Sequence, residues 1–295
     1  MRLNHPWRTG ALSLLALGAL GLLPEPARAG LTDLQTWTQV QDPADPHFTG
    51  LATATQVTLS ASGGPVPGGT DIGYQSVNGK TPGASSLGYA FSPGADFALA
   101  IDFAITFGNT PVGYLGLGFG IGEDRDGMNS AGVAVLFDDG SPALIFAAAA
   151  RIDDINQLPL GLPVLASATG SMFVSYQAAS GNVTLGASGS QGATSPTGTA
   201  TFTGIQNDWD DGDLLVSFFL RSDGSLGTAW QSGTADALFS NLRVLSGTPL
   251  AVPAPPPLAL LALGLAALAV RRRPASSAGQ RRWRDRARLK CGGQD

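Results

Sequence analysis

An unbroken alternation of large apolar side chains with small or polar ones limits the fold of this chain more than any other feature. Phe97, Leu99, Ile101, Phe103, Ile105 and Phe107 alternate with Ala98, Ala100, Asp102, Ala104 and Thr106. Successive side chains of an extended strand point to opposite faces of a sheet, so a period of two predicts a long strand with one buried face.

Shorter segments with the same character lie on both sides of this strand. They are separated by turns rich in Gly, Asp, Asn, Ser and Pro, and no segment has a convincing helical period. The sequence therefore predicts an all-β fold, an antiparallel jelly-roll β-sandwich in one domain over residues 30–250. The predicted strands are 53–60, 72–77, 87–91, 97–107, 115–121, 133–137, 143–148, 171–177, 183–187, 199–205, 214–220, 227–231 and 237–245, with 151–163 as an irregular connection that could hold a helical turn.

Composition and charge exclude several classes of protein. The chain has 295 residues, of which 43% are hydrophobic and 13% charged, with 40 Gly, and this composition excludes a disordered chain and argues against a helical bundle. Residues 30–250 hold 19 of the 22 acidic residues and 5 of the 17 basic ones, a formal charge of about −14. Such an acidic domain argues against a nucleic-acid partner.

The N-terminal 29 residues have the layout of a secretory signal peptide. Two arginines precede an uncharged apolar run at 11–23, and two prolines then lead to Ala27-Arg28-Ala29, so cleavage is expected after Ala29. Thirteen helical residues span roughly 20 Å against about 30 Å of hydrocarbon, which disfavours a membrane-spanning anchor there.

The C-terminal part has a second apolar segment. Every residue from 250 to 270 is apolar, four prolines lie between 253 and 257, and Arg271-Arg272-Arg273 follow. The expected short transmembrane helix covers 258–270, with the arginines in the cytoplasm and the domain on the exported side. The alternative is an apolar helix that packs on the domain.

This C-terminal layout resembles the PEP-CTERM sorting signal of Gram-negative bacteria over residues 251–273. The resemblance is carried by Val252-Pro253-Ala254-Pro255, by a Leu/Ala/Gly helix with Gly264, and by Arg271, Arg272 and Arg273. It implies recognition by exosortase, an integral-membrane cysteine protease. Ala254 stands where the family usually has Glu. Residues 274–295 are expected to form a basic disordered tail.

The predicted sandwich resembles the concanavalin A-like, laminin-G-like jelly rolls that are often found ahead of such signals. The residues that carry this resemblance are 88–91, 96–107, 118–132 and 237–244. It implies a binding or display module at least as often as an enzyme.

Two acidic loops are candidate sites. Glu123, Asp124, Asp126 and Asn129 place oxygen ligands close together in one loop, which suits calcium, although a polar turn would have the same composition. Asp208, Trp209 and Asp210 combine an indole with carboxylates, which suits stacking on a sugar ring if the indole is exposed. The alternative for Trp209 is an inward hydrophobic anchor. Trp37 and Trp230 adjoin predicted strands and are weaker candidates.

Catalytic residues are not predicted. His47 is the only histidine after residue 29, and the lone Cys291 follows the apolar segment, which leaves almost nothing for a zinc site or a triad. Glu123 is the only glutamate in 30–250, and the strand motif of the jelly-roll glucanases is absent. Glycines 116, 118 and 120 bare one strand face, either for packing or for a ligand.

The predicted function is that of a non-enzymatic, exported surface or extracellular-matrix protein that binds exopolysaccharide or mediates adhesion. If the predicted calcium site is occupied, calcium would aid this binding. Its expected partners are the Sec translocon, an exosortase-type protease and the membrane, with anchoring in the inner membrane before processing and a final place at the cell surface or outside. Two alternatives remain open. One is a carbohydrate-active hydrolase that uses Glu123 and a nearby aspartate, and the other is a purely structural coat protein.

Overall fold

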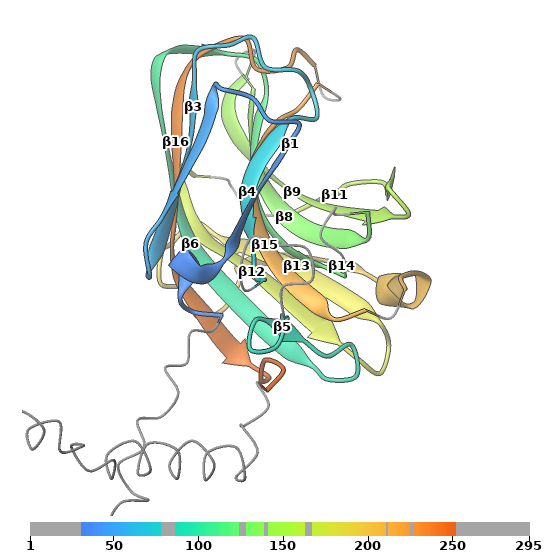
Figure 1. Ribbon diagram of the computed structural model, residues 1–295. Helices are drawn as coiled ribbons and strands as arrows, with labels where there is room; N and C mark the ends of the chain where they lie inside the picture. The colour runs from blue at the N-terminus through green and yellow to red at the C-terminus, as the bar shows by residue number, and fades with distance from the viewer. Residues whose placement is uncertain are drawn as a thin grey trace, which may run out of the picture. The chain divides into compact units, whose positions relative to one another are not determined.

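The computed structural model describes residues 31–77, 86–123, 128–138, 141–162, 167–210, 212–224 and 227–251. These residues form two antiparallel sheets that face one another (Figure 1), so the predicted all-β antiparallel sandwich is confirmed. The predicted signal peptide, residues 252–273 of the sorting segment and the basic tail lie outside the described residues. No helix within the described part is long and apolar enough to cross a membrane.

The first sheet has nine strands, of which seven follow the order β1-β4-β15-β7-β8-β9-β10, while β11 pairs with β9 and β5 with β15. Its strands are β1 (Thr38–Asp42), β4 (Asp71–Gln75), β5 (Ala90–Phe91), β7 (Leu115–Gly122), β8 (Ser130–Asp138), β9 (Ser141–Ile152), β10 (Ile155–Asn156), β11 (Leu160–Gly161) and β15 (Leu214–Ser222).

The second sheet has seven strands in the order β14-β13-β12-β6-β16-β3-β2. Its strands are β2 (Phe48–Ala52), β3 (Gln56–Ser62), β6 (Phe97–Val112), β12 (Thr169–Gln177), β13 (Asn182–Ser188), β14 (Gly198–Phe202) and β16 (Ser232–Ser246). Two 3₁₀ turns, at Leu34–Thr36 and Ile205–Asp208, complete the described elements.

The chain passes repeatedly from one sheet to the other, as in a jelly roll. It changes sheet after β1, β3, β5, β6, β11, β14 and β15, so strands far apart in the sequence become neighbours. In the seven-stranded sheet β16 lies between β3 and β6, which Figure 1 shows as orange beside blue and green. The last strand is thereby held by the early part of the chain on both of its edges.

The core fills the space between the sheets with the apolar set that the alternation predicts. Phe97, Leu99, Ile101, Phe103 and Ile105 of β6 are all buried. Aromatic rings from both sheets meet there, with the centroids of Phe218 and Phe239 4.7 Å apart. A β-strand with one face in such a core normally presents polar side chains on its other face.

Three details of the sequence prediction are wrong. Residues 227–231 do not form a ladder strand, because the backbone of Trp230 has other partners: its N–H donates to the side chain of Ser222, at the end of β15, at 3.0 Å, and its carbonyl accepts from Val66, which lies outside the strands. The connection 151–163 holds β10 and β11, which return to pair with β9, within its described residues. Strands β1 and β2 were not expected, since their short, mixed sequences lack a clear alternation.

Candidate functional site

Glu123, the first residue of one acidic loop that the sequence singled out, contacts the other acidic loop where β7 ends and β15 begins, in the interior of the nine-stranded sheet. Glu123 follows β7, and its carboxylate accepts hydrogen bonds from the backbone N–H of Asp210 at 2.5 Å and of Gly212 at 2.8 Å. Both oxygens of Glu123 therefore bind the second loop. Glu123 of the predicted calcium site is therefore hydrogen-bonded to the loop that was predicted as a sugar site.

Trp209 is buried, with 5% of its surface exposed. Its indole N–H donates to the carbonyl of Arg151 at 3.2 Å, which fixes the ring against the C-terminal end of β9. The expectation of an exposed indole that stacks on a sugar is wrong, and the alternative of an inward anchor is confirmed. Asp208 and Asp210 remain exposed beside it.

Of the four residues predicted to bind calcium, the structure describes only Glu123 and Asn129. Asn129 is 2% exposed, and its Oδ1 accepts from the backbone N–H of Asp153 at 2.8 Å, so this amide stabilises the turn after β9. Asp124 and Asp126 lie outside the described residues. No group of three candidate metal ligands occurs within the part of the chain that the structure describes. Calcium binding stays a prediction that depends on Asp124 and Asp126.

The glycines of β7 point away from the core and are closely approached by neighbours. An alanine Cβ at Gly118 would overlap the ring of Phe219 on β15, and one at Gly120 would overlap the carbonyl of Ala131 on β8. These glycines serve packing within the sheet, as the first of the two sequence-based alternatives proposed.

A buried ionic cluster that the sequence did not reveal lies on the outer face of the seven-stranded sheet. Asp102 of β6 is 5% exposed although its side chain points away from the core. Its carboxylate accepts from Ser171 Oγ at 2.6 Å, Asn241 Nδ2 at 2.8 Å, Gly192 N at 3.0 Å and Arg243 Nη1 at 2.9 Å. A bulge in β16 at Asn241, whose φ is 53°, brings both Asn241 and Arg243 to this face.

The cluster keeps Asp102 ionised. Burial alone would raise the pKa of this carboxyl, but the hydrogen bonds from Ser171, Asn241, Gly192 and Arg243 together hold it below its ordinary value of 3.8. A carboxylate with four donors is a poor general acid or base, because its lone pairs are occupied and its protonated form is disfavoured.

The same cluster fastens a loop across the sheet. Residues 189–196, here called the strap, join β13 to β14, and Gly192 and Ala193 of the strap bind Asp102 and Arg243. At the end of the strap, Pro196 lies on Gly186 of β13, where an alanine Cβ would come within 2.6 Å of the proline Cβ. The strap is thus held against the outer face at its middle, by Gly192 and Ala193, and at its C-terminal end, by Pro196.

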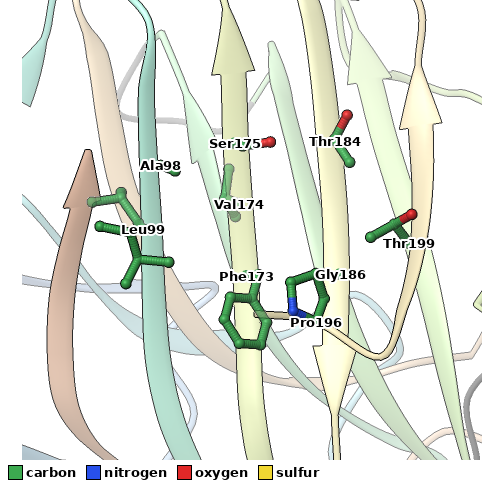
Figure 2. Close-up of a pocket in the computed structure, with 10 residues that line it drawn as sticks. Ala98, Leu99, Phe173, Val174, Ser175, Thr184, Gly186, Pro196 and Thr199 are labelled. Atoms are coloured by element: carbon green, nitrogen blue, oxygen red, sulfur yellow. The ribbon is translucent and has the colours of Figure 1, made fainter. Parts of the chain in front are cut away.

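Next to Pro196 the outer face contains a small cavity of about 90 Å³ (Figure 2). Phe173, Pro196 and Leu245 give it an apolar lining, and the hydroxyl-bearing side chains of Ser175, Thr184 and Thr199 also line it. The hydroxyls of Thr184 and Thr201 are hydrogen-bonded at 2.9 Å. Apolar surface bordered by a few hydroxyls is the usual composition of a small-ligand site.

His47 has a structural role. Its Nδ1 lies 2.9 Å from the carbonyl of Ser62, next to the turn that follows β3. Trp37 and Trp230 are buried as well, at 3% and 0% exposure.

No protein-family model and no curated protein matches the sequence. The fold is similar to solved structures at low identity. A legume lectin-like domain from Entamoeba histolytica is 11% identical, with a TM-score of 0.41 over 70% of this chain and 95% of that one. An alginate lyase from Klebsiella pneumoniae is 12% identical, with a TM-score of 0.44 over 74% and 97%. A Bacteroides ovatus GH16 protein solved with a glucan product is 10% identical, with a TM-score of 0.41 over 72% and 95%. The likeness concerns overall architecture, and no activity of these proteins is carried over by it.

Proposed function

We propose that this chain is a non-enzymatic carbohydrate-binding protein whose site is the cavity on the outer face of the seven-stranded sheet. The observation that carries the proposal is the pairing of an apolar lining from Phe173, Pro196 and Leu245 with hydroxyls on the same cavity. The C–H face of a sugar packs on apolar surface while its hydroxyls exchange hydrogen bonds with neighbouring side chains.

The hydrogen bonds of the candidate catalytic carboxylates, Glu123 and Asp102, support binding without catalysis. Hydrolysis with retention needs two carboxyl groups about 5 to 5.5 Å apart, one of them with a raised pKa. Glu123 has both oxygens on backbone N–H groups, and Asp102 accepts from four donors while its pKa is lowered. Neither of them has the environment of a catalytic acid.

A charge placed on the cavity wall tests the location of the site. Thr199 is exposed and lines the cavity, whereas Thr49 is an exposed threonine of β2 at the far edge of the same sheet. We expect Thr199→Lys to weaken the binding of the full chain to its glycan at least about tenfold and Thr49→Lys to leave it unchanged. A glycan array followed by affinity electrophoresis measures both.

The two alternatives give different results in the same assay. Release of sugar products that disappears in Glu123→Gln would identify a hydrolase. Absence of retention by any glycan would leave the structural coat protein as the better description.

We also propose that the chain is exported through the Sec translocon, held in the inner membrane, and processed by an exosortase-type protease for display at the cell surface or release outside. The support is the sequence of residues 1–29 and 251–273 alone. N-terminal sequencing of the exported protein is expected to begin at Gly30. Retention of residues 1–29 in the exported protein would contradict the proposal.

A further inference from the structure

The volume of the cavity limits what can enter it. An apolar cavity of about 150 Å³ accommodates one benzene molecule, and pockets that enclose whole drug-sized ligands start at about 300 Å³. The cavity beside Pro196 measures about 90 Å³. A pyranose ring with its hydroxyls is larger than benzene, so the ring must remain outside. Only a substituent of a few heavy atoms fits within.

The lining indicates that this substituent is apolar at its tip. Leu245 is 39% exposed, and it lines the cavity together with the other apolar side chains, among them Phe173 and Pro196. The hydroxyl-bearing Ser175 and Thr184 stand on the adjoining strands β12 and β13, where they can reach polar atoms beside the tip (Figure 2). A methyl group attached close to a polar atom matches this arrangement.

The charges favour an uncharged ligand. Among the described residues that line the cavity, none is charged. The charged pair on the same sheet face, Asp102 and Arg243, is neutral as a unit, with its atoms 2.9 Å apart. An anionic sugar would therefore meet no unpaired cation in the described site and would approach a domain of about −14 formal charge.

From size, lining and charge we infer that the cavity selects an uncharged sugar that carries a methyl-terminated substituent, which enters between Phe173 and Leu245 beside Pro196. The substituent is an acetamido group or the methyl group of a 6-deoxy sugar. This inference rests on the proposed function, because it names the chemical class of ligand for the same site.

Pairs of glycans that differ only in this substituent test the inference on the full chain. Oligomers of β-1,4-linked N-acetylglucosamine are compared with the corresponding glucose oligomers, and L-fucose with L-galactose. Burial of one methyl group is worth about 0.8 kcal/mol, or about fourfold in affinity, and a matched small pocket reaches 10- to 200-fold. At least fourfold tighter binding of one methyl-bearing member is expected, and the pair that shows it identifies the source of the methyl group.

Two alanines of β6 provide matched variants for the cavity. Ala98 lines it, and Ala104 lies six residues along the same strand on the same outer face, and both are half-buried. Ala98→Leu is expected to remove the preference for the methyl-bearing sugar, and Ala104→Leu to retain it. Leu245→Ala widens the cavity without burying a larger side chain, and is expected to reduce the preference if Ala98→Leu does not fold.

The outcomes separate the inference from the function it rests on. Equal binding of both members of each pair, or tighter binding of a uronate polymer than of neutral glycans, overturns the inference and leaves carbohydrate binding intact. Absence of binding to every glycan overturns both. A preference that survives Ala98→Leu and Leu245→Ala places the methyl group elsewhere and also overturns the inference.

Discussion

Replacing Asp102 by asparagine should destabilise the domain far more than its position on an outer sheet face suggests. The change keeps the shape of the side chain but removes the charge that Arg243 faces at 2.9 Å. Breaking a buried ion pair from one side costs about 3 to 5 kcal/mol, because the remaining charge is left without compensation. The Arg243 side chain is 19% exposed, so part of its charge stays hydrated and the lower value of about 3 kcal/mol applies.

Urea denaturation of the full chain, followed by tryptophan fluorescence, measures this cost. For a domain of roughly 220 residues, 3 kcal/mol corresponds to a fall of about 6 to 12 °C in Tm. Asp236→Asn is the matched control, since Asp236 is exposed on the same face of β16 and accepts one hydrogen bond from Ser60. Its effect should be much smaller.

The double variant Asp102→Asn/Arg243→Met separates the charge from the hydrogen bonds. It removes the uncompensated cation, so part of the lost stability should return. If Asp102→Asn and Asp236→Asn cost the same, the outer-face cluster contributes no more than an exposed carboxylate. The reasoning that the cluster fastens the strap would then be refuted.

Four other predictions follow from the described contacts. The pKa of Asp102 is lowered in the folded state, so its ionisation should stabilise the domain fully above the ordinary carboxyl pKa of 3.8, and this stabilisation should be lost as the pH falls through the lowered pKa. In denaturation experiments between pH 2 and 6, the free energy of unfolding should therefore depend less steeply on pH in Asp102→Asn than in the unchanged chain. Glu123→Gln removes a charged acceptor from the backbone N–H groups of Asp210 and Gly212, so we expect a loss of about 1 to 3 kcal/mol and faster amide hydrogen exchange at both. Gly120→Ala should destabilise more than Gly118→Ala in urea titrations, because a backbone carbonyl cannot move aside as the Phe219 side chain can. The calcium prediction expects a higher Tm in millimolar calcium than in chelator, and the rise should vanish when Asp124 and Asp126 are both changed to asparagine.

The alternation in the sequence was sufficient to predict the sheets but not the cluster on their outer face. From Phe97 to Ile105, the large apolar residues of β6 are buried as the period of two requires, because local periodicity and burial have the same physical cause. Asp102 sits at an outward position of this pattern. Its partners Ser171 and Asn241 are 69 and 139 residues away, and only the order of β12, β6 and β16 brings them to it.

The roles of the residues in the two acidic loops could not be predicted from the sequence either. Their composition predicted metal and sugar contacts, yet Glu123 binds backbone N–H groups and Trp209 is buried. Carboxylates serve ions and turns with the same oxygens, so composition could not distinguish the two uses. The cavity beside Pro196 left no trace in the sequence, because threonine, serine and leucine are ordinary residues of strands.

The position of β16 determines how the domain would respond to tension at its C-terminal end. A pull on Ala251 must first break the hydrogen bonds of Leu250 with Gly88 and Ala90, and the force then enters β16. This strand is bonded to β3 along one edge and to β6 along the other, and it is antiparallel to both. Force along its axis therefore shears two hydrogen-bonded ladders at once instead of unzipping one. The lifetime of the fold under tension then depends on the rate at which β16 separates from β3 and β6.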